Sequence, residues 1–520
     1  MALIPILGVP STFKVPGQYA EILFAQGPST ASSEAREVIL VMPKIASPAG
    51  SWTAGNVYRI NNEKDAIDGA GSGSPLHRAA RKFLLANDDA KLWALPYEPS
   101  SGAGVATADG TVTYVNNPTS TGVASVTICG EICSVGYDST FTITTLAAAM
   151  VQVINSRTWL PVTATSALGV VTLTAKVAGA SQGDGTIPVI RYRAEVSSGT
   201  STTVSTSGAA LGLGAGTSGV DGATTENANL VAALGNIAQA RYYYMGFSVF
   251  DATNLASIQS HVSTKSEPTP GLRSVAVVGY NHTLGTAQTL ATGRNYERLQ
   301  MVWQPNSDAT PGDLAANMLA IRQQFEQLDS AYNFDGYRNA AKWQIPAAES
   351  QTDWPTFDDQ NDAINDGITP IASDARGSYV VMTVTTRSKN TGGTVDDFRA
   401  AETHRVSVAD DFTDTLLLRH TLNYSNKKLK GDELLSDGSV NVNQRLYRNV
   451  VTPHQYKPFV KQLVQEFADA AKLQEAAKSK SGLRVVRDPN NNGRLEVGLD
   501  LHVIDLLHQT TFRLAEVSTG

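Results

Sequence analysis

The chain has 520 residues, of which 17% are charged, and a formal net charge of −7 at pH 7. This length predicts three or four domains, and the low charge favours a β-rich chain whose surface is partly covered by other chains. The net negative charge excludes a strongly basic surface for nucleic acid, and no apolar run reaches the ~18 residues of a membrane span. We therefore expect no nucleic-acid partner and no membrane insertion.

The opening residues are apolar and carry no signal for export. Residues 2–24 show no helical period, and Pro5, Pro10 and Pro16 interrupt them, which favours an extended segment. No charged segment precedes an apolar core, so the pattern of a signal peptide is missing and an unexported chain is expected.

An α/β layer follows this segment. Residues 37–42 are a short apolar run of the buried-strand type, and a glycine-rich stretch leads into a predicted helix at residues 76–87. Residues 91–95 are predicted to be the next strand. A strand, a helix and a strand at this spacing indicate an α/β domain.

Composition changes at about Glu98, and from there to about Asp221 the chain is rich in Thr, Ser, Gly and Val. One helix is expected at residues 145–155, and residues 197–221 are interpreted as a flexible exit linker. Cys129 and Cys133 flank a predicted hairpin turn and are interpreted as free thiols in a reducing compartment, not as half of a metal site. The expected strands are residues 110–115, 124–135, 160–165, 170–176 and 187–193.

The α/β character then returns, so the β-rich segment is an insertion into a doubly wound domain. Thr310-Pro311 predicts the start of a helix whose apolar residues recur every three or four positions up to Leu328. The other expected helices are residues 229–240, 254–264 and 358–366, and the expected strands are residues 242–249, 273–279, 299–303 and a pair that includes 379–386.

A last unit begins near Asn449. Pro458 is placed in the first turn of a helix that reaches about Lys478, followed by a strand at residues 483–486 and a turn at residues 488–493. Residues 494–503 alternate between polar and apolar side chains, as a strand with one buried face does, and residues 510–514 suggest a second extended piece. Two open-ended strands, one at each end of the chain, either pair with each other in one domain or exchange with neighbouring copies.

No reactive constellation is found. Gly69 to Ser74 lacks the third glycine of a dinucleotide-binding loop, and the Gly-x-Ser-x-Gly match at Ser181 lies between strands, where a glycine-rich loop is expected. The eight histidines show no metal-ligand spacing, and we expect no metal and no cofactor. The acidic start of the helix at residues 358–366 is explained by stabilisation of the helix dipole, without catalysis. The basic run Lys427 to Lys430 is interpreted as a solvated loop, with a partner contact as the alternative.

Several short motifs in order resemble contractile bacteriophage tail sheath proteins, especially the Mu-like branch. They are residues 71–76 and 92–96, an Ile-x-Gly-x hairpin at residues 128–131, residues 160–164, 170–175, 365–370 and 383–386, Val451-Thr452-Pro453 and residues 494–497. Together they cover nearly the whole chain. Residues 242–244 and 341–354 depart from the family pattern.

The resemblance implies a multidomain α/β fold. Its centre would be a doubly wound domain similar to subtilisin but without a proteolytic triad. It would carry an inserted β-rich domain and a small α+β C-terminal domain with exchanged terminal strands. The expected boundaries are an arm at 1–24, the α/β domain at 25–98 and 222–448, the outer insertion at 99–221, the inner C-terminal domain at 449–493, and the C-terminal strand and arm at 494–520.

The resemblance also implies a structural role without catalysis. Copies would polymerise as a helical sleeve around a tail tube through exchanged arms and would contract to drive the tube through the host envelope, leading to genome ejection. Tail tube, baseplate and tail terminator proteins would be the partners, and the chain would be a virion component assembled in the host cytoplasm. The alternatives are a hydrolase-like α/β enzyme with a β-rich binding insertion, and a tail tube or baseplate protein.

Two sets of residues are expected to make the assembly contacts. The helix that starts near Pro458 would face the tube and would release it when the sleeve contracts. Lys461 and Lys472, eleven residues apart, would return to one face of that helix. The tube-facing residues would be Lys457, Lys461, Lys472 and Lys478, with the run Lys427 to Lys430 as the alternative contact with the tube. The inter-subunit strand residues would be Val15, Tyr19, Ile22, Leu495, Val497, Leu499, Leu501 and Val503.

Overall fold

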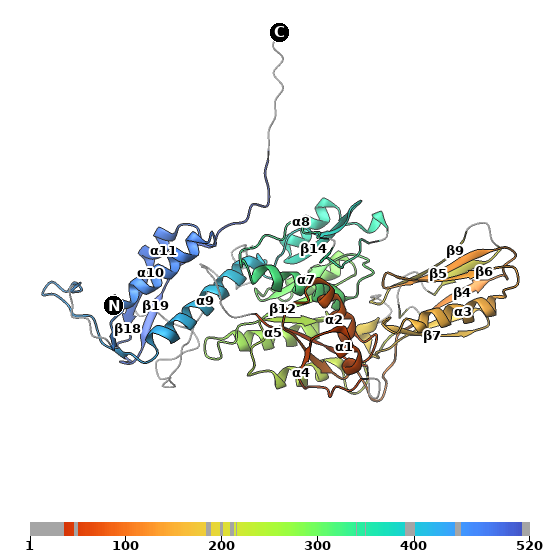
Figure 1. Ribbon diagram of the computed structural model, residues 1–520, viewed down its shortest axis with the longest axis horizontal. Helices are drawn as coiled ribbons and strands as arrows, with labels where there is room; N and C mark the ends of the chain where they lie inside the picture. The colour runs from red at the N-terminus through yellow and green to blue at the C-terminus, as the bar shows by residue number, and fades with distance from the viewer. Residues whose placement is uncertain are drawn as a thin grey trace, which may run out of the picture. The chain divides into compact units, whose positions relative to one another are not determined.

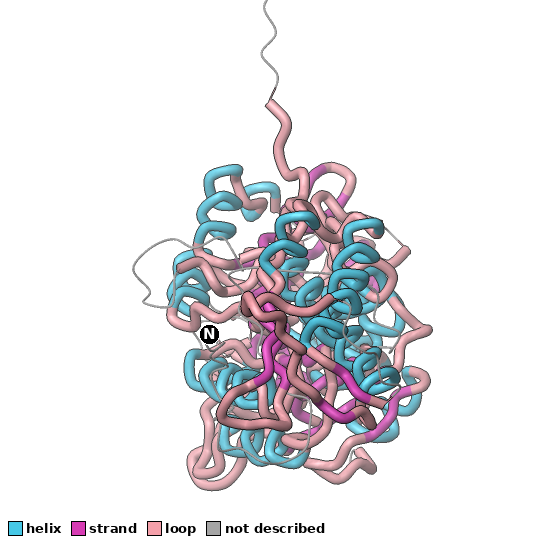
Figure 2. The backbone as a smooth tube through the Cα atoms, turned by 90° about the vertical axis from the view of Figure 1, so that its left-hand side faces the viewer, coloured by secondary structure: helices cyan, strands magenta, loops and turns pink. Residues whose placement is uncertain are grey.

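The computed structural model describes residues 36–45, 50–183, 189–197, 201–207, 213–214, 216–339, 341–348, 350–389, 401–442 and 449–511. These residues divide into two compact units. The α/β unit contains the described residues of 36–328 and 336–403, and the C-terminal unit contains 329–335 and the described residues of 404–511. Figure 1 labels many of the helices and strands, and Figure 2 distinguishes helices from strands by colour.

An eight-stranded sheet forms the centre of the α/β unit, in the order β15-β14-β13-β12-β11-β1-β3-β2. All neighbouring pairs from β3 to β14 are parallel, and the edge strands β2 and β15 are antiparallel to their neighbours. The strands are β1 (Val38–Pro43), β2 (Tyr58–Ile60), β3 (Leu92–Tyr97), β11 (Tyr244–Phe247), β12 (Val275–Tyr280), β13 (Leu299–Trp303), β14 (Ile368–Asp374) and β15 (Gly377–Val380).

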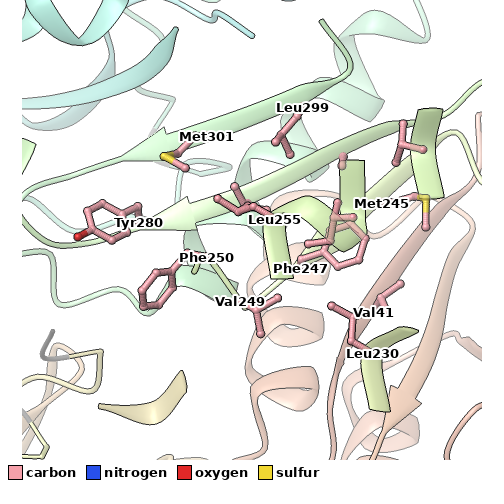
Figure 3. Packing of buried hydrophobic residues seen from close by; sticks show 14 of the residues in the cluster. Val41, Leu230, Met245, Phe247, Val249, Phe250, Leu255, Tyr280, Leu299 and Met301 are labelled. Carbon is pink, nitrogen blue, oxygen red and sulfur yellow. The ribbon is translucent and has the colours of Figure 1, made fainter. Parts of the chain in front are cut away.

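Helices cover both faces of this sheet, so the mixed α/β class is confirmed and the sheet is doubly wound. One face packs on α2 (Pro75–Ala86) and α7 (Pro311–Glu326), with α1 (Glu63–Ala70) beside α2. The other face packs on α4 (Glu226–Asn236), α5 (Ala252–Ser266), α6 (Leu284–Thr292) and α8 (Phe357–Asn365). Figure 3 shows part of this second core, where Met245, Phe247 and Met301 from the strands meet Leu230 and Leu255 from the helices.

Local sequence explains where two of these helices begin. Ser74 caps α2 and Pro75 occupies its first turn, while Thr310 and Asp313 form a reciprocal capping box at the start of α7. Gly279 of β12 permits close approach of α7, because an added Cβ would lie 2.1 Å from the carbonyl oxygen of Pro311. These signals match the predicted helix starts.

The described residues of the inserted domain form two antiparallel sheets and one α-helix, α3 (Ile143–Ser156), around a hydrophobic core of their own. One sheet has the order β10-β4-β8-β7 and the other β6-β5-β9. Its strands are β4 (Asp109–Val115), β5 (Gly122–Ile128), β6 (Glu131–Tyr137), β7 (Val162–Ala167), β8 (Val170–Ala175), β9 (Tyr192–Val196) and β10 (Thr203–Thr206). Cys129 and Cys133 are buried free thiols, and Cys129 lies in the β5–β6 turn.

The flexible linker expected at residues 197–221 is wrong in part, because β10 lies there and pairs with β4. Two chain segments connect the inserted domain to the large sheet, and they are joined by an antiparallel bridge between Ser101 and Thr224. Val189 packs in the core of the large sheet. Arg193 donates to both carboxylate oxygens of Asp308, at 2.9 and 3.0 Å. The inserted domain is therefore packed onto the α/β unit.

The C-terminal unit is built around two helices. The first residue of α9 (Thr403–Tyr424) is assigned to the α/β unit, and the rest of the helix belongs to the C-terminal unit. There α9 packs on α10 (Pro453–Asp469) through Phe412 and Phe467, whose ring centroids are 5.1 Å apart. The smaller elements are α11 (Ala476–Gly482) and two two-stranded sheets, β16 (Lys428–Leu429) with β17 (Val450–Val451) and β18 (Arg484–Arg487) with β19 (Leu495–Gly498).

The expected start of α10 at Pro458 is wrong. Thr452 caps the helix by a capping box with Gln455, and Pro453 takes the first position, so Pro458 lies inside the helix. The expected end near Lys478 is also wrong, because α10 stops at Asp469. Ala471 has a φ of 54°, a left-handed conformation that cannot continue the helix.

Candidate interaction surfaces of the C-terminal unit

The β18–β19 hairpin has open edges. Four residues of each strand pair in antiparallel register, from Arg484 with Gly498 to Arg487 with Leu495, and each strand has one partner within the described residues. Val485 packs with Val460 and Leu483 in a small core below the hairpin. Because a lone two-stranded sheet gains little from its own pairing and exposes unpaired backbone groups, its edges suit the addition of an extended segment.

The prediction that residues 494–503 are extended is confirmed for the backbone of β19 (Leu495–Gly498), but the expected burial of the apolar side chains on one face is not found there. Leu495 and Val497 are half-buried, whereas Glu496 is only 3% exposed. The guanidinium of Arg494 lies 3.3 Å from the carboxylate of Glu496, so the charge on this inner position has an ionic partner. Both faces of β19 are therefore partly covered.

The residues that follow β19 lie along their own unit. Val503 bridges Leu473, the Gln474 amide donates to the His502 carbonyl at 2.9 Å, and the Ile504 amide donates to the Lys472 carbonyl at 3.2 Å. Leu501 and Val503 are each 7% exposed and belong to two small cores of this unit.

Two further contacts hold this segment. Arg405 Nη2 lies 2.5 Å from the Asp505 carboxylate, and His404 Nε2 lies 3.1 Å from the Ile504 carbonyl. The predicted exchange residues Leu499, Leu501 and Val503 are thus packed within their own chain, and Leu499 is partly buried there. The predicted exchange residues Val15, Tyr19 and Ile22 lie outside the described residues.

The four predicted tube-facing lysines do not share one helix face. Lys461 is exposed and Lys457 is half-buried on α10, while Lys478 lies on α11 with its ammonium 2.9 Å from Glu475. Lys472 is buried beyond the end of α10, and its Nζ lies 3.2 Å from Asp411 of α9. The prediction for Lys472 is therefore wrong, because the helix that would have carried it outward stops first.

The sequence patterns did not lead to a prediction of α9, one of the two long helices of the C-terminal unit. A helical signal was available, since the apolar residues Val408, Phe412 and Leu416 recur every four positions. The basic run Lys427 to Lys430 follows this helix, and within it Lys428 and Leu429 form the short strand β16.

The motifs tested for chemistry lie elsewhere. Ser181 is in a short 3₁₀ turn (Ala180–Gln182), not at the strand-to-helix junction that a nucleophile elbow needs. Within the described ranges no group of three His, Cys, Asp or Glu side chains could hold a metal ion. No helix of the described residues is long and apolar enough to cross a membrane.

The known proteins that are similar to this chain include two tail sheath proteins, whereas no family model matches it. The Mu-like prophage FluMu tail sheath protein of Haemophilus influenzae is 28% identical over 171 residues. The match spans 33% of this chain and about a third (34%) of that relative. A solved structure of a sheath tail protein from Desulfitobacterium hafniense aligns with 94% of this chain and all of its own, at 13% identity and a TM-score of 0.45, which is too distant for a functional conclusion. The curated match confirms the resemblance indicated by the motifs, and this chain is similar to tail sheath proteins of the Mu-like kind.

Proposed function

We propose that this chain is the structural subunit of a contractile phage tail sheath, without catalytic activity. The sequence match to a Mu-like tail sheath protein carries the proposal. Copies polymerise as a helical sleeve around a tail tube, and the sleeve works with baseplate and tail terminator proteins in the virion. Contraction rearranges the contacts between copies and drives the tube through the host envelope. The free energy comes from contacts that are more favourable in the contracted arrangement.

The open edges of the β18–β19 hairpin support joining by strand addition. A terminal segment of a neighbouring copy adds to β18 or β19, and its backbone hydrogen bonds connect the two subunits. The donor segments are residues 2–24 and the residues after His508. Leu501 and Val503 anchor the donor at the C-terminal end, since they are packed in their own unit.

Deletion of residues 509–520 tests this joining. Because Gln509 to Thr511 are exposed, the truncated protein should keep its melting temperature while losing the ability to form sleeves visible by electron microscopy. A longer deletion that starts at residue 494 would not test the exchange alone, because it would also remove β19, Leu501 and Val503 from the folded C-terminal unit. Sleeves of normal length from the 1–508 protein would contradict the proposed exchange of the C-terminal segment.

Lys457 and Lys461 of α10 are the proposed contacts with the tube. The double charge reversal of these two lysines to Glu should reduce assembly on purified tubes at low salt and leave tube-free polymerisation unchanged, since exposed charge contacts are screened by salt. Lys478→Glu on α11 is the matched control. Equal co-assembly of the double variant and the control would place the tube contact elsewhere.

A further inference from the structure

The turn between β18 and β19 contains the only Asn-Gly dipeptide of the chain, Asn492-Gly493. Both residues are exposed. In such a dipeptide the backbone nitrogen of the glycine can attack the side-chain amide carbon of the asparagine, because glycine has no Cβ to block the approach. The two groups belong to neighbouring residues, so their proximity favours ring closure. The dipeptide is therefore a candidate site of spontaneous chemical modification.

One contact of this dipeptide favours the attacking form of the nitrogen. Arg487 Nε donates to the Asn492 carbonyl oxygen at 2.8 Å. Removal of the Gly493 amide proton places negative charge on this same oxygen, since the nitrogen and the carbonyl of a peptide bond share one resonance system. A guanidinium held against an oxygen on which charge develops stabilises that charge. Arg487 therefore lowers the free energy of the deprotonated nitrogen.

The other contacts of the turn decide how readily the two reacting groups meet. The Asn492 side-chain amide makes no hydrogen bond with the residues that the structure describes, so it is free to rotate toward Gly493. The Gly493 amide donates to Asn491 Oδ1 at 3.2 Å, and this exposed bond must open before a base can take the proton. Arg487 and Asn491 thus act on the reaction in opposite directions.

We propose that Asn492 is a deamidation site and that Arg487 promotes its reaction in the folded protein. A base takes the Gly493 amide proton, the nitrogen forms a bond to Asn492 Cγ, and the Cγ–Nδ2 bond breaks. The Nδ2 group takes a proton from water and leaves as ammonia. Water then opens the cyclic imide at either carbonyl, which gives aspartate or isoaspartate at position 492. No oxidant or reductant takes part.

The product changes the hairpin that carries it. A carboxylate replaces a neutral amide beside Arg487, and the isoaspartate form adds one atom to the main chain between β18 and β19. Because the type and length of a turn fix the register of a hairpin, this added atom disturbs the antiparallel pairing of the two strands. Aged copies should then accept a neighbouring segment less well than fresh copies do, a consequence that rests on the proposed self-assembly.

Peptide mass spectrometry of the folded full chain measures the reaction, after incubation at mildly alkaline pH and digestion with pepsin at acidic pH. Asn492 should gain the mass of one deamidation, whereas Asn490 and Asn491, which no glycine follows, should not. Arg487→Gln should slow the reaction about three- to tenfold, because an exposed charged donor stabilises the developing charge only modestly. Asn491→Ala should accelerate it, because the Gly493 amide proton is then accessible.

Matched controls separate the contact from the charge. Arg484→Gln removes the same charge at the exposed far end of β18 and should leave the rate unchanged. Gly493→Ala should suppress the reaction and keep the turn, because the added Cβ would lie 3.7 Å from Asn491 Oδ1, an ordinary contact. In urea the contact of Arg487 is lost, so Arg487→Gln and the wild type should react at the same rate.

Two results would overturn the proposal. The site is wrong if the folded protein keeps Asn492 intact while the chain unfolded in urea is modified. The role of Arg487 is wrong if Arg487→Gln and Arg484→Gln react equally fast in the folded state.

Electron microscopy of aged protein tests the consequence for assembly. Wild-type protein should form fewer sleeves after ageing than when fresh, whereas Gly493→Ala should form as many as its own fresh sample. Equal loss or equal retention in both proteins contradicts the consequence and leaves the deamidation site standing. If fresh wild-type protein forms no sleeves, the proposed sheath function fails, and mass spectrometry still decides the site.

Discussion

Glu226 should make the α/β unit less stable as pH rises towards neutrality. This first residue of α4 is 2% exposed, and the Tyr97 hydroxyl donates to its Oε1 at 2.9 Å. Burial raises the pKa of the Glu226 carboxyl to about 7, against an ordinary value of 4.5, although hydrogen bonds from Ser181 and Tyr97 act in the opposite direction. The native state thus holds the proton more tightly than the unfolded state. The stabilisation is complete below about pH 4.5 and is lost as pH rises through about 7.

The variant Glu226→Gln isolates this effect, because an amide has the shape of the protonated carboxyl and does not titrate. A shift of about 2.5 pH units corresponds to about 3 kcal/mol of unfolding free energy. For a unit of roughly 360 residues this is about 4 °C in melting temperature. The variant should therefore match the wild type near pH 4.5 and exceed it by this amount at pH 8.

Scanning calorimetry of the full chain at pH 5 and pH 8 provides the measurement, read on the transition of the α/β unit. The control Asp88→Asn removes the same charge from an exposed position and should leave the difference between the two pH values as in the wild type. If Glu226→Gln and the wild type lose the same melting temperature between pH 5 and pH 8, Glu226 does not titrate as its burial requires.

Three further outcomes are expected. Lys472→Met should cost the C-terminal unit about 3–5 kcal/mol, because it removes the ammonium that faces the buried Asp411 carboxylate, to which Ser330 also donates. Lys461→Ala on the exposed face of α10 should change the unfolding free energy by less than about 0.5 kcal/mol, and urea titration measures both variants. Phe467→Ala, at a fully buried position, should cost about 3–5 kcal/mol in the same assay. Replacement of residues 99–221 by a Gly/Ser linker should lower the melting temperature of the α/β unit, because it removes Val189 from the core of the large sheet. An unchanged melting temperature would show that the packing of the inserted domain on the large sheet adds no stability.

Most elements of the α/β unit could be predicted because their signals are local. A buried strand such as β13 (Leu299–Trp303) is a continuous apolar run, and α7 has its cap, its proline and its apolar period within 20 residues. The start of α10 was mispredicted because Pro453 and Pro458 compete for the same role. The Thr452–Gln455 capping box decides between them.

The assembly surfaces were harder to predict, because their residues meet across long sequence separations or depend on one backbone angle. Asp411 and Lys472 are 61 residues apart, and nothing near either one marks it as half of a buried pair. The left-handed conformation of Ala471 ends α10, and alanine has no sequence signature for it. Alternation at residues 495–503 indicated an extended segment correctly, but only tertiary contacts show that Leu501 and Val503 pack within their own unit.

The bridge between Ser101 and Thr224 also bears on how the chain folds. The parallel strands β3 and β11 flank β1 in the sheet but are separated in sequence by the whole inserted domain. If the inserted domain folds first on its own core, its two ends come together and the loop between β3 and β11 shrinks from about 145 to about 25 residues. The entropic free-energy cost of closing that loop then falls by about 1.5 kcal/mol. The large sheet would thus form faster after the insertion than before it, which makes the insertion an early step in folding of the unit that carries it.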